Sequence, residues 1–245
     1  MDFLKENYLF TVNNKDFYRD GDTMVALYKE GTEKSEVMLE ASYQSLAEEL
    51  GILVPSVIEV KKIEKRWALV TSYVGNKLLS TITSNNAWDD AMLSSFVAAE
   101  LSVHSKKSYD FPKMRDIIHR ALGEVRLDGG VRYKLHTTLD QLPKHNKLCH
   151  GRMLPTRVIV GDDGNFYIVD WLFAAQGNAS AEAAHTYLTL MLDYGQELAE
   201  RYITVFARKS DVAIDYINRW LPIVAAVMLG ERNDAGQQIL MKFVK

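Results

Sequence analysis

The first third of the chain alternates short apolar stretches with polar turns, and one helical stretch interrupts this pattern. The predicted strands span residues 8–12, 16–19, 23–28, 57–63 and 67–73. Asn13-Asn14 suits a tight hairpin turn between the first two strands. Between Ser35 and Leu50 apolar positions recur at helical spacing, and Gly51 supplies a stop for that helix. The predicted order is three strands, one helix and two strands.

From residue 75 onward the apolar positions follow helical periodicity. The clearest helix runs from Ala87 to Ser105, with a wide apolar stripe on one face. Further helices are predicted at 113–122, 131–142, 180–193, 195–208, 211–230 and about 233–243. The only strand pair predicted in this part joins residues 157–160 and 166–169. The pattern is that of an α+β protein with a small β-rich lobe (1–74) and a larger, mainly helical lobe (75–245).

Composition and charge exclude several classes of protein. With 245 residues, 47% of them hydrophobic and 25% charged, the chain is long enough to bury a full core. A net charge of −3 argues against nucleic-acid binding. Its single cysteine excludes an internal disulfide and fits a reducing compartment. The first residues lack the order of a signal peptide, and the longest apolar run, 220–230, is too short to span a bilayer. We expect a cytoplasmic protein with no membrane contact.

The most specific motif lies between residues 148 and 171. It reads His150-Gly151-Arg152-x-Leu154-x-x-Arg157, and after a hairpin it ends in Asp170-Trp171. This layout resembles the catalytic segment of the aminoglycoside phosphotransferase and choline kinase-like family, which runs H-G-D-x-H-x-x-N and then, after a hairpin, I-D-W. The resemblance implies a two-lobed protein kinase-like fold. It places Arg152 where the family has its catalytic Asp and Arg157 where it has its metal-binding Asn.

The resemblance extends over nearly the whole chain. The stretch 34–55 resembles the family's small-lobe helix, with Glu40 before a Leu-Gly-x-x-x-Pro ending. The stretch 69–75 resembles the hinge strand, 101–104 the end of the first large-lobe helix, and 177–187 the family's G-D-P-x-x-D-x-A-R-T-Y. By this resemblance, the nucleotide-contacting positions are Glu40, Ser72, Tyr73, Val74 and Arg157.

The chemistry expected at Arg152 differs from that of the family. In phosphoryl transfer an Asp accepts the proton of the substrate hydroxyl while metal ions bridge the phosphates. A guanidinium carries donors only and stays protonated, so Arg152 is not expected to act as a base. Loss of a general base alone costs roughly 10²- to 10⁴-fold in rate.

Arg157 affects metal binding more severely than Arg152 affects proton transfer. It brings a positive charge to the position where an Asn would offer a neutral oxygen to a divalent cation. A unit charge about 4 Å from a dication is repelled by roughly 8 kcal/mol at an effective dielectric of 20. Two-metal catalysis is therefore disfavoured.

The small lobe also departs from the family pattern. The family's third strand carries a Lys that contacts the phosphates and pairs with the helix Glu, and Ala26 stands at this position. Lys29 lies an odd number of residues along the strand, so its side chain points to the opposite face. We therefore expect Glu40 to lack its usual partner. The turn at Asn13-Asn14 contains no glycine, which disfavours close approach of the backbone to phosphates.

Asp170 is the one charged catalytic position that the chain retains. It is expected either to hold magnesium or to form an ion pair with Arg152 or Arg157. For the two arginines, three roles stay open at this point: solvated surface residues, internal salt bridges, or an anion site.

The changes at Ala26, Arg152, Leu154 and Arg157 point to a catalytically deficient, pseudokinase-like protein. It would bind a small molecule or a protein partner in or near the former ATP cleft. The alternative is an active ATP- and magnesium-dependent phosphotransferase that acts on an alcohol group through a rearranged site. A third interpretation is an interaction module whose cleft is filled by its own side chains.

Overall fold

The computed structural model describes residues 6–84, 88–231 and 235–244, and the chain divides into two compact units. The first unit contains the residues up to 87 together with 154–173, and the second contains 88–153 and 174–245. The segment 154–173, although distant in sequence, therefore packs with the N-terminal strands. The two lobes predicted from the sequence, 1–74 and 75–245, remain a prediction, because these units are defined by contacts and not by a single boundary in the sequence.

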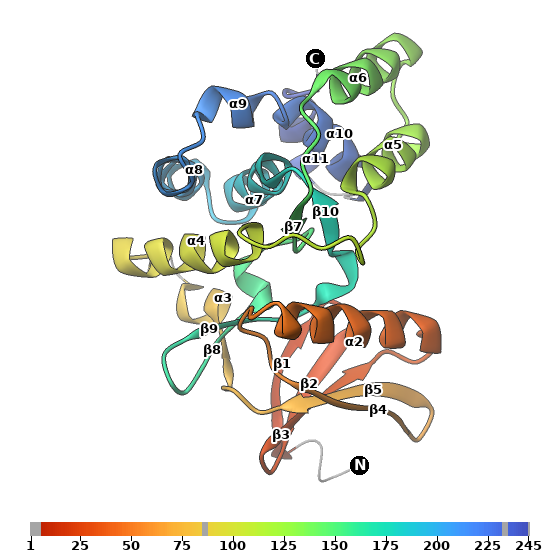
Figure 1. Cartoon of the computed structure of the whole chain (residues 1–245), viewed down its shortest axis with the longest axis vertical. Helices are drawn as coiled ribbons and strands as arrows, with labels where there is room; N and C mark the ends of the chain where they lie inside the picture. The colour runs from red at the N-terminus through yellow and green to blue at the C-terminus, as the bar shows by residue number, and fades with distance from the viewer. Residues whose placement is uncertain (1–5, 85–87, 232–234, 245) are drawn as a thin grey trace. The chain divides into compact units, whose positions relative to one another are not determined.

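The first unit is built on a five-stranded antiparallel sheet (Figure 1). Its strands are β1 (Tyr8–Val12), β2 (Lys15–Asp20), β3 (Thr23–Tyr28), β4 (Val57–Ile63) and β5 (Arg66–Ser72), in the order β1-β2-β3-β5-β4. Helix α2 (Lys34–Glu49) is inserted between β3 and β4. The predicted strand and helix positions are confirmed to within two residues. Gly51 has a φ of 76°, the left-handed conformation expected where the chain leaves a helix.

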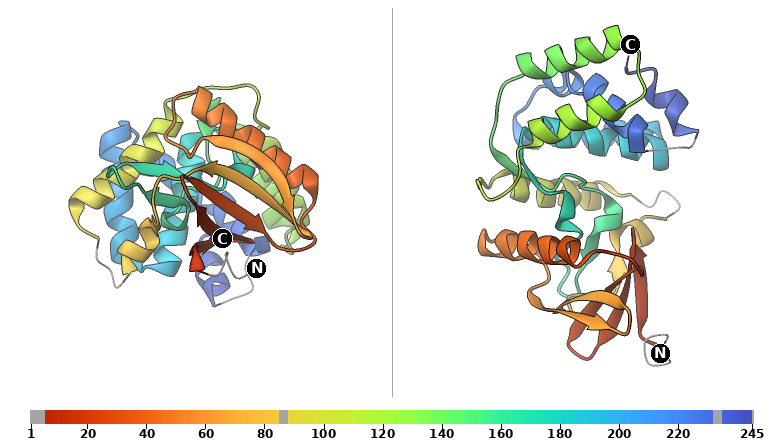
Figure 2. Two further views of the ribbon diagram at one scale, coloured as in Figure 1. Left: turned by 90° about the horizontal axis from the view of Figure 1, so that it is seen from below. Right: turned by 90° about the vertical axis from the view of Figure 1, so that its right-hand side faces the viewer.

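The inner face of the sheet forms the main core of this unit. Phe10, Phe17, Met24, Ala26 and Leu69 are buried there together with residues of α2, which lies across this face (Figure 2). The opposite face holds a smaller apolar cluster of Val25, Leu27, Ala68 and Val70. The sheet is therefore covered on one side by α2, and its central strand β3 is buried on both faces.

The rest of the first unit carries the hairpin predicted from the sequence motif. The hairpin consists of β8 (Val158–Val160) and β9 (Phe166–Ile168), and the 3₁₀ turns η2 (Pro155–Arg157) and η3 (Trp171–Phe173) lie on either side of it. The other two elements are strand β6 (Lys77–Leu78) and helix α3 (Leu79–Ile82). Strands β6, β8 and β9 form a second small sheet. The backbone N–H of Ile168 donates to the carbonyl of Leu53, which attaches this hairpin to the segment after α2.

The second unit is mainly helical. Its helices are α4 (Asp90–His104), α5 (Met114–Glu124), α6 (Gly129–Gln141), α7 (Ala179–Asp193), α8 (Gln196–Ser210), α9 (Ile214–Asn218), α10 (Leu221–Glu231) and α11 (Gly236–Leu240). Strands β7 (Lys147–Cys149) and β10 (Ala175–Gly177) pair in an antiparallel ladder. The prediction of a single strand pair after residue 75 was therefore wrong, because three-residue strands are too short to show a periodicity.

One helix prediction in the second unit needs correction. The predicted helix 211–230 is divided into α9 and α10. Pro222 lacks a backbone N–H and is tolerated in the first turn of a helix, which favours a new start at this point. Ala87 and residues 233 and 234 of the predicted helices lie outside the described residues. Within the described part of the chain, no helix has the length and apolar character needed to traverse a bilayer.

The close approach of two segments of the first unit at Gly75 gives a test of the packing. A Cβ added at Gly75 would lie 2.5 Å from the carbonyl oxygen of Val160, which is backbone and cannot rotate away. We expect Gly75→Ala to lower the free energy of unfolding by about 1–3 kcal/mol, the usual cost of overpacking. Gly123→Ala, in α5 with open space around the new Cβ, is the matched control. It should raise stability slightly in the same denaturant titration.

Candidate functional site

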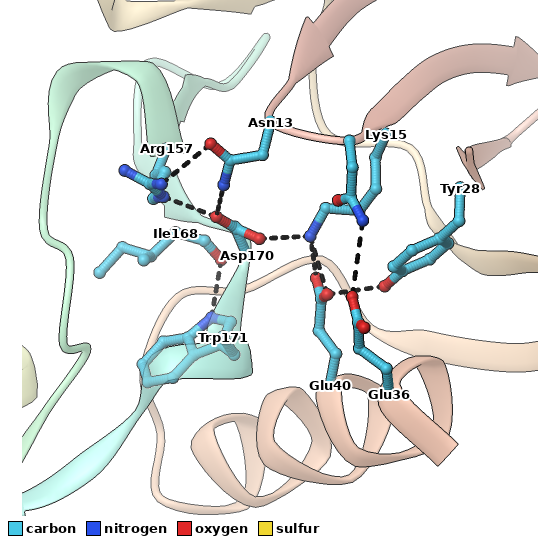
Figure 3. A network of polar contacts seen from close by, with 10 residues as sticks. Asn13, Lys15, Tyr28, Glu36, Glu40, Arg157, Ile168, Asp170 and Trp171 are labelled. Carbon is cyan, nitrogen blue, oxygen red and sulfur yellow. Dashed lines mark hydrogen bonds and ion pairs between the residues drawn. The ribbon is translucent and has the colours of Figure 1, made fainter. Parts of the chain in front are cut away.

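Glu40 is not without a partner, contrary to the sequence-based expectation. The Nζ of Lys15 donates to both carboxylate oxygens of Glu40, at 2.6 and 2.8 Å. The hydroxyl of Tyr28 donates to the same carboxylate at 2.7 Å (Figure 3). Lys15 and Glu40 are 1% and 2% exposed, so the pair is fully inside the first unit. A lysine–glutamate pair is present, but its lysine comes from a different strand than in the family pattern.

The strand register explains how Lys15 replaces the lysine expected at Ala26. In the ladder between β2 and β3, Phe17 lies opposite Ala26 and Lys15 lies opposite Tyr28. Residues two apart on a strand face the same side, so Lys15 and Phe17 share the face on which Ala26 lies. Lys15 therefore projects from the neighbouring strand onto the face of the sheet that carries Ala26. The sequence contains a sign of this arrangement: Lys15 lies two residues before the apolar Phe17, so the two side chains are expected on the same, inward face of the strand.

Asp170 accepts hydrogen bonds from three residues, two of the β1–β2 hairpin and one of its own segment (Figure 3). Its Oδ1 accepts from the Nζ of Lys15, and its Oδ2 accepts from Nδ2 of Asn13 at 2.5 Å and from Nε of Arg157 at 2.6 Å. The backbone of Asp170 has a φ of 71°, a conformation that is uncommon for a residue other than glycine. Both oxygens of this carboxylate are therefore already engaged within the first unit.

Arg157 belongs to this buried cluster and is not a surface residue. Its side chain is 4% exposed, and besides Asp170 it donates from Nη2 to Oδ1 of Asn13 at 3.1 Å. It ends the 3₁₀ turn that begins at Pro155, and this turn directs the side chain inward. Of the three roles open for Arg157, the structure favours the internal salt bridge. Asn13, at the tip of the β1–β2 hairpin, was missed by the sequence analysis because turn asparagines are ordinary.

The formal charges of the ionisable residues around Asp170 sum to zero. Lys15 and Arg157 are formally positive, and Glu40 and Asp170 are formally negative. Burial opposes ionisation of Asp170, but Lys15 and Arg157 outweigh it and hold the pKa of Asp170 below its ordinary value. Burial likewise opposes the charge on Lys15, yet Glu40 and Asp170 raise its pKa. Burial raises the pKa of Glu40, and Lys15 works against that shift. The salt bridge between Lys15 and Asp170 is therefore ionised at neutral pH.

A small cavity adjoins the cluster in the first unit. Its lining includes Ala26, Glu40, Gln44, Thr71 and Asp170, and its volume is about 10 Å³. A space of this size holds about one water molecule. The side chains around Glu40 and Asp170 are thus packed closely enough to leave no room for a phosphate group in that cavity.

Arg152 lies in the helical unit and forms an ion pair there. Its Nη2 donates to Oε1 of Glu231, at the end of α10, over 2.7 Å. The side chain is 26% exposed, so this pair is partly solvated. The predicted alternatives for Asp170 are thereby separated: Arg157 pairs with it, whereas the ion pair of Arg152 is made with Glu231.

His150 and Gly151 form part of a buried framework in the helical unit. The backbone N–H of His150 donates to Oε2 of Glu182 at 3.0 Å, and Nε2 of His104 lies 2.8 Å from the same oxygen. Gly151 has a φ of 85°, which favours glycine. Burial opposes ionisation of Glu182, but its contacts with His104 and His150 lower its pKa below the ordinary value. Glu182 therefore fixes the backbone at His150 from α7.

The predicted nucleotide-contacting residues of the hinge use their backbone groups within the first unit. The N–H of Tyr73 donates to the carbonyl of Asp22 at 2.9 Å, and the carbonyl of Val74 accepts from the N–H of Asp162 at 2.8 Å. The hydroxyl oxygen of Ser72 accepts from the N–H of Ser56 at 2.9 Å. Their role in binding a nucleotide stays a prediction.

Comparison with known proteins supports the fold. The sequence matches no protein-family model and no curated protein. Its structure resembles an aminoglycoside-3'-phosphotransferase of type VIII, with 17% identity, a TM-score of 0.64, and coverage of 92% of this chain and 98% of the other. A choline kinase from Streptococcus pneumoniae gives 15% identity, a TM-score of 0.64, and coverage of 96% and 91%. An aminoglycoside phosphotransferase from Streptomyces rimosus, solved with ADP and streptomycin, gives 14% identity and a TM-score of 0.62. The match covers 86% of this chain and 90% of the other.

These similarities confirm the α+β, protein kinase-like fold that the sequence predicted. They also confirm that the resemblance read from residues 148–171 is to aminoglycoside phosphotransferases and choline kinases. At this level of identity they establish the fold and not the activity.

The importance of Lys15 is tested by removing its charge. We expect Lys15→Met to lower the free energy of unfolding by about 3–5 kcal/mol, because the buried carboxyl groups of Glu40 and Asp170 would both lose the cation that they share. Lys29→Met, at an exposed position one residue beyond the end of β3, is the control. It should change stability by less than about 0.5 kcal/mol. Equal effects of the two substitutions in urea titrations would contradict the assignment.

The lowered pKa of Asp170 predicts an acid dependence of stability. Its stabilisation is present above the unfolded value of about 3.8 and is lost as the pH falls through the lower folded-state value. We expect Asp170→Asn to be less stable at pH 7 and to show a shallower loss between pH 5 and 2. The difference in slope should approach about 1.4 kcal/mol per pH unit, the value for one proton. Asp215→Asn, at an exposed position in α9, is the control and should change stability at pH 7 by less than about 0.5 kcal/mol.

Proposed function

We propose that this phosphotransferase-like chain is catalytically deficient and acts by binding a partner rather than by transferring phosphate. The observation that carries the proposal is the engagement of both oxygens of Asp170 by Lys15, Asn13 and Arg157. In a protein kinase-like site, catalysis depends on positioning and on metal ions that neutralise the phosphates. Asp170 is the retained acidic residue on which such a metal would depend.

The residues around Asp170 do not fit magnesium. Mg²⁺ requires near-octahedral oxygen ligands at about 2.0–2.1 Å and gives up its waters reluctantly. Its approach to Asp170 would displace two strong charge-assisted hydrogen bonds and would bring a dication next to the guanidinium of Arg157. The guanidinium of Arg157 already places a positive charge at the position where the family motif has a metal ligand. Metal-dependent phosphoryl transfer is therefore disfavoured on electrostatic grounds.

The hairpin between β1 and β2 supports the same conclusion. In protein kinases a glycine-rich loop covers the phosphates of the nucleotide. In this chain the corresponding hairpin carries Asn13 at its tip, and Asn13 bonds to both Asp170 and Arg157. Lys15, at the start of the second strand, bonds to Asp170 as well. The hairpin tip thus occupies space beside Asp170 that phosphate groups would need.

The base position gives independent support. Arg152 stands where the family has its catalytic Asp, and its guanidinium forms an ion pair with Glu231. A permanently protonated group does not accept the proton of a hydroxyl substrate. These features together favour the interpretation of an interaction module over that of a nucleotide-dependent ligand binder.

The second candidate is an active ATP-dependent phosphotransferase with a rearranged site. The observation that favours it is the buried pair of Lys15 and Glu40, which restores from strand β2 the lysine–glutamate contact expected of an active kinase-like site. For this candidate to hold, nucleotide binding would have to release Lys15 and Arg157 from Asp170. Metal and nucleotide binding therefore separate the two candidates.

The test is a titration of the full chain with ATP, with and without Mg²⁺, followed by Mn²⁺ as a paramagnetic substitute. We expect no magnesium-dependent binding of ATP to the wild-type protein. Arg157→Asn removes the repulsive charge and one donor from Asp170, so this variant should gain a Mn²⁺ site. Arg201→Asn is the matched control, because Arg201 pairs with Asp90 in the helical unit.

Two results would overturn the proposal. One is magnesium-dependent ATP binding by the wild-type chain together with consumption of ATP in the presence of hydroxyl substrates. The other is a Mn²⁺ affinity that Arg157→Asn and Arg201→Asn change equally, which would show that Arg157 does not control metal access to Asp170.

A further inference from the structure

Helices α5 and α6 lie side by side in the helical unit (Figure 1), and a histidine of α5 contacts a histidine of α6. The Nδ1 atoms of His119 and His136 are 2.7 Å apart, and the planes of the two rings differ by 5°. The ring centroids are 5.0 Å apart, much farther than the two nitrogens. The rings are therefore nearly coplanar and meet edge to edge, with Nδ1 of each as the innermost atom.

Asp140 determines which nitrogen of His119 carries a proton. Its Oδ1 lies 3.0 Å from Nε2 of His119, and a carboxylate only accepts hydrogen bonds. The proton of a neutral His119 ring is therefore held on Nε2, which leaves the lone pair of Nδ1 directed at His136. Nη1 of Arg115 lies 3.8 Å from the same oxygen of Asp140.

This arrangement has the features of a histidine prepared for a metal ion. Metal-binding histidines almost always donate their other ring N–H to a carboxylate, carbonyl or water, which fixes the tautomer and makes the ligand more basic. Two nitrogens at about 2.1 Å from one ion and at right angles to each other would be about 3 Å apart. In the observed arrangement the two Nδ1 lone pairs point at each other, so an ion about 2.1 Å from both nitrogens requires each ring to turn by about 50°.

We propose that His119 and His136 bind a divalent transition-metal ion of the copper, nickel and zinc class through their Nδ1 atoms. Imidazole nitrogen favours these metals over magnesium and calcium, and Cu²⁺ is expected to bind most tightly. Asp140 acts as a positioning residue. His119 is 30% exposed and Asp140 63% exposed, so the ion has access from solvent and water can complete its coordination.

Binding of the metal changes the position of one proton. Without metal, His136 donates its Nδ1–H to the bare Nδ1 of His119. With metal, His136 carries this proton on Nε2, and both Nδ1 lone pairs are available to the ion. Between neutral rings this is a change of tautomer with no net gain or loss of protons.

The test is a titration of the full-length protein with ZnCl₂, followed by the ¹⁵N resonances of its histidine rings. We expect the Nδ1 resonances of both histidines to shift. The Nε2 resonance of His136 should shift as well, because it gains the proton, whereas Nε2 of His119 keeps its proton and should change little. His119→Gln and His136→Gln should each weaken Zn²⁺ and Cu²⁺ binding at least tenfold. Asp140→Asn should weaken it about 10- to 100-fold, as expected for loss of a carboxylate that orients a ligand.

His145→Gln is the matched control, because His145 is an exposed histidine of the same unit outside the pair. It should leave metal affinity unchanged, and thermal unfolding of each variant verifies that it folds. The proposal is overturned if neither Nδ1 resonance shifts with Zn²⁺, or if His145→Gln reduces affinity as much as His136→Gln. In either case the pair would be a hydrogen bond between two imidazoles and no more.

Discussion

The first unit depends on the neutralisation of one buried carboxylate. Asp170 is 2% exposed, and a charge taken out of water at such a site costs several kcal/mol unless donors and opposite charges surround it. Lys15 and Arg157 provide the charges, and Asn13 adds a neutral donor. Because Lys15 also faces Glu40, the cluster contains two positive and two negative groups. Loss of one member would leave another uncompensated, which makes the whole set interdependent.

This cluster also explains why residues 154–173 pack with the N-terminal strands. Asp170 and Arg157 come from that segment, Asn13 and Lys15 from the first hairpin, and Glu40 from α2. Three segments far apart in sequence are therefore joined by charge-assisted hydrogen bonds, which are stronger than neutral ones. Apolar packing alone is less directional and would hold the hairpin less specifically. The hydrogen bond from Asn13 to Asp170 thus helps to fix the position of the hairpin tip.

Much of the fold was readable from the sequence, because strands of five to seven residues show their alternation and long helices show their stripe. The contacts of Lys15 were not readable in the same way. Parity with Phe17 predicts that Lys15 points inward, but its partner depends on the register that places Phe17 opposite Ala26. Register is a property of two strands, and a one-residue slip reverses every side chain. The expectation that Glu40 lacks a partner failed for this reason, as it considered only the strand that carries Ala26.

The permanent charge of Arg157, at the position where the family motif has its metal-binding Asn, affects the whole cluster. A magnesium ion binds and leaves with its nucleotide, so a metal-dependent site changes its charge during each cycle. A guanidinium attached to the chain stays protonated and stays in place. The balance among Lys15, Glu40, Asp170 and Arg157 is therefore complete without any ligand, and ligand binding would have to break it. The cluster therefore stabilises the first unit without an exchangeable ion, which agrees with the proposed role in binding a partner rather than in transferring phosphate.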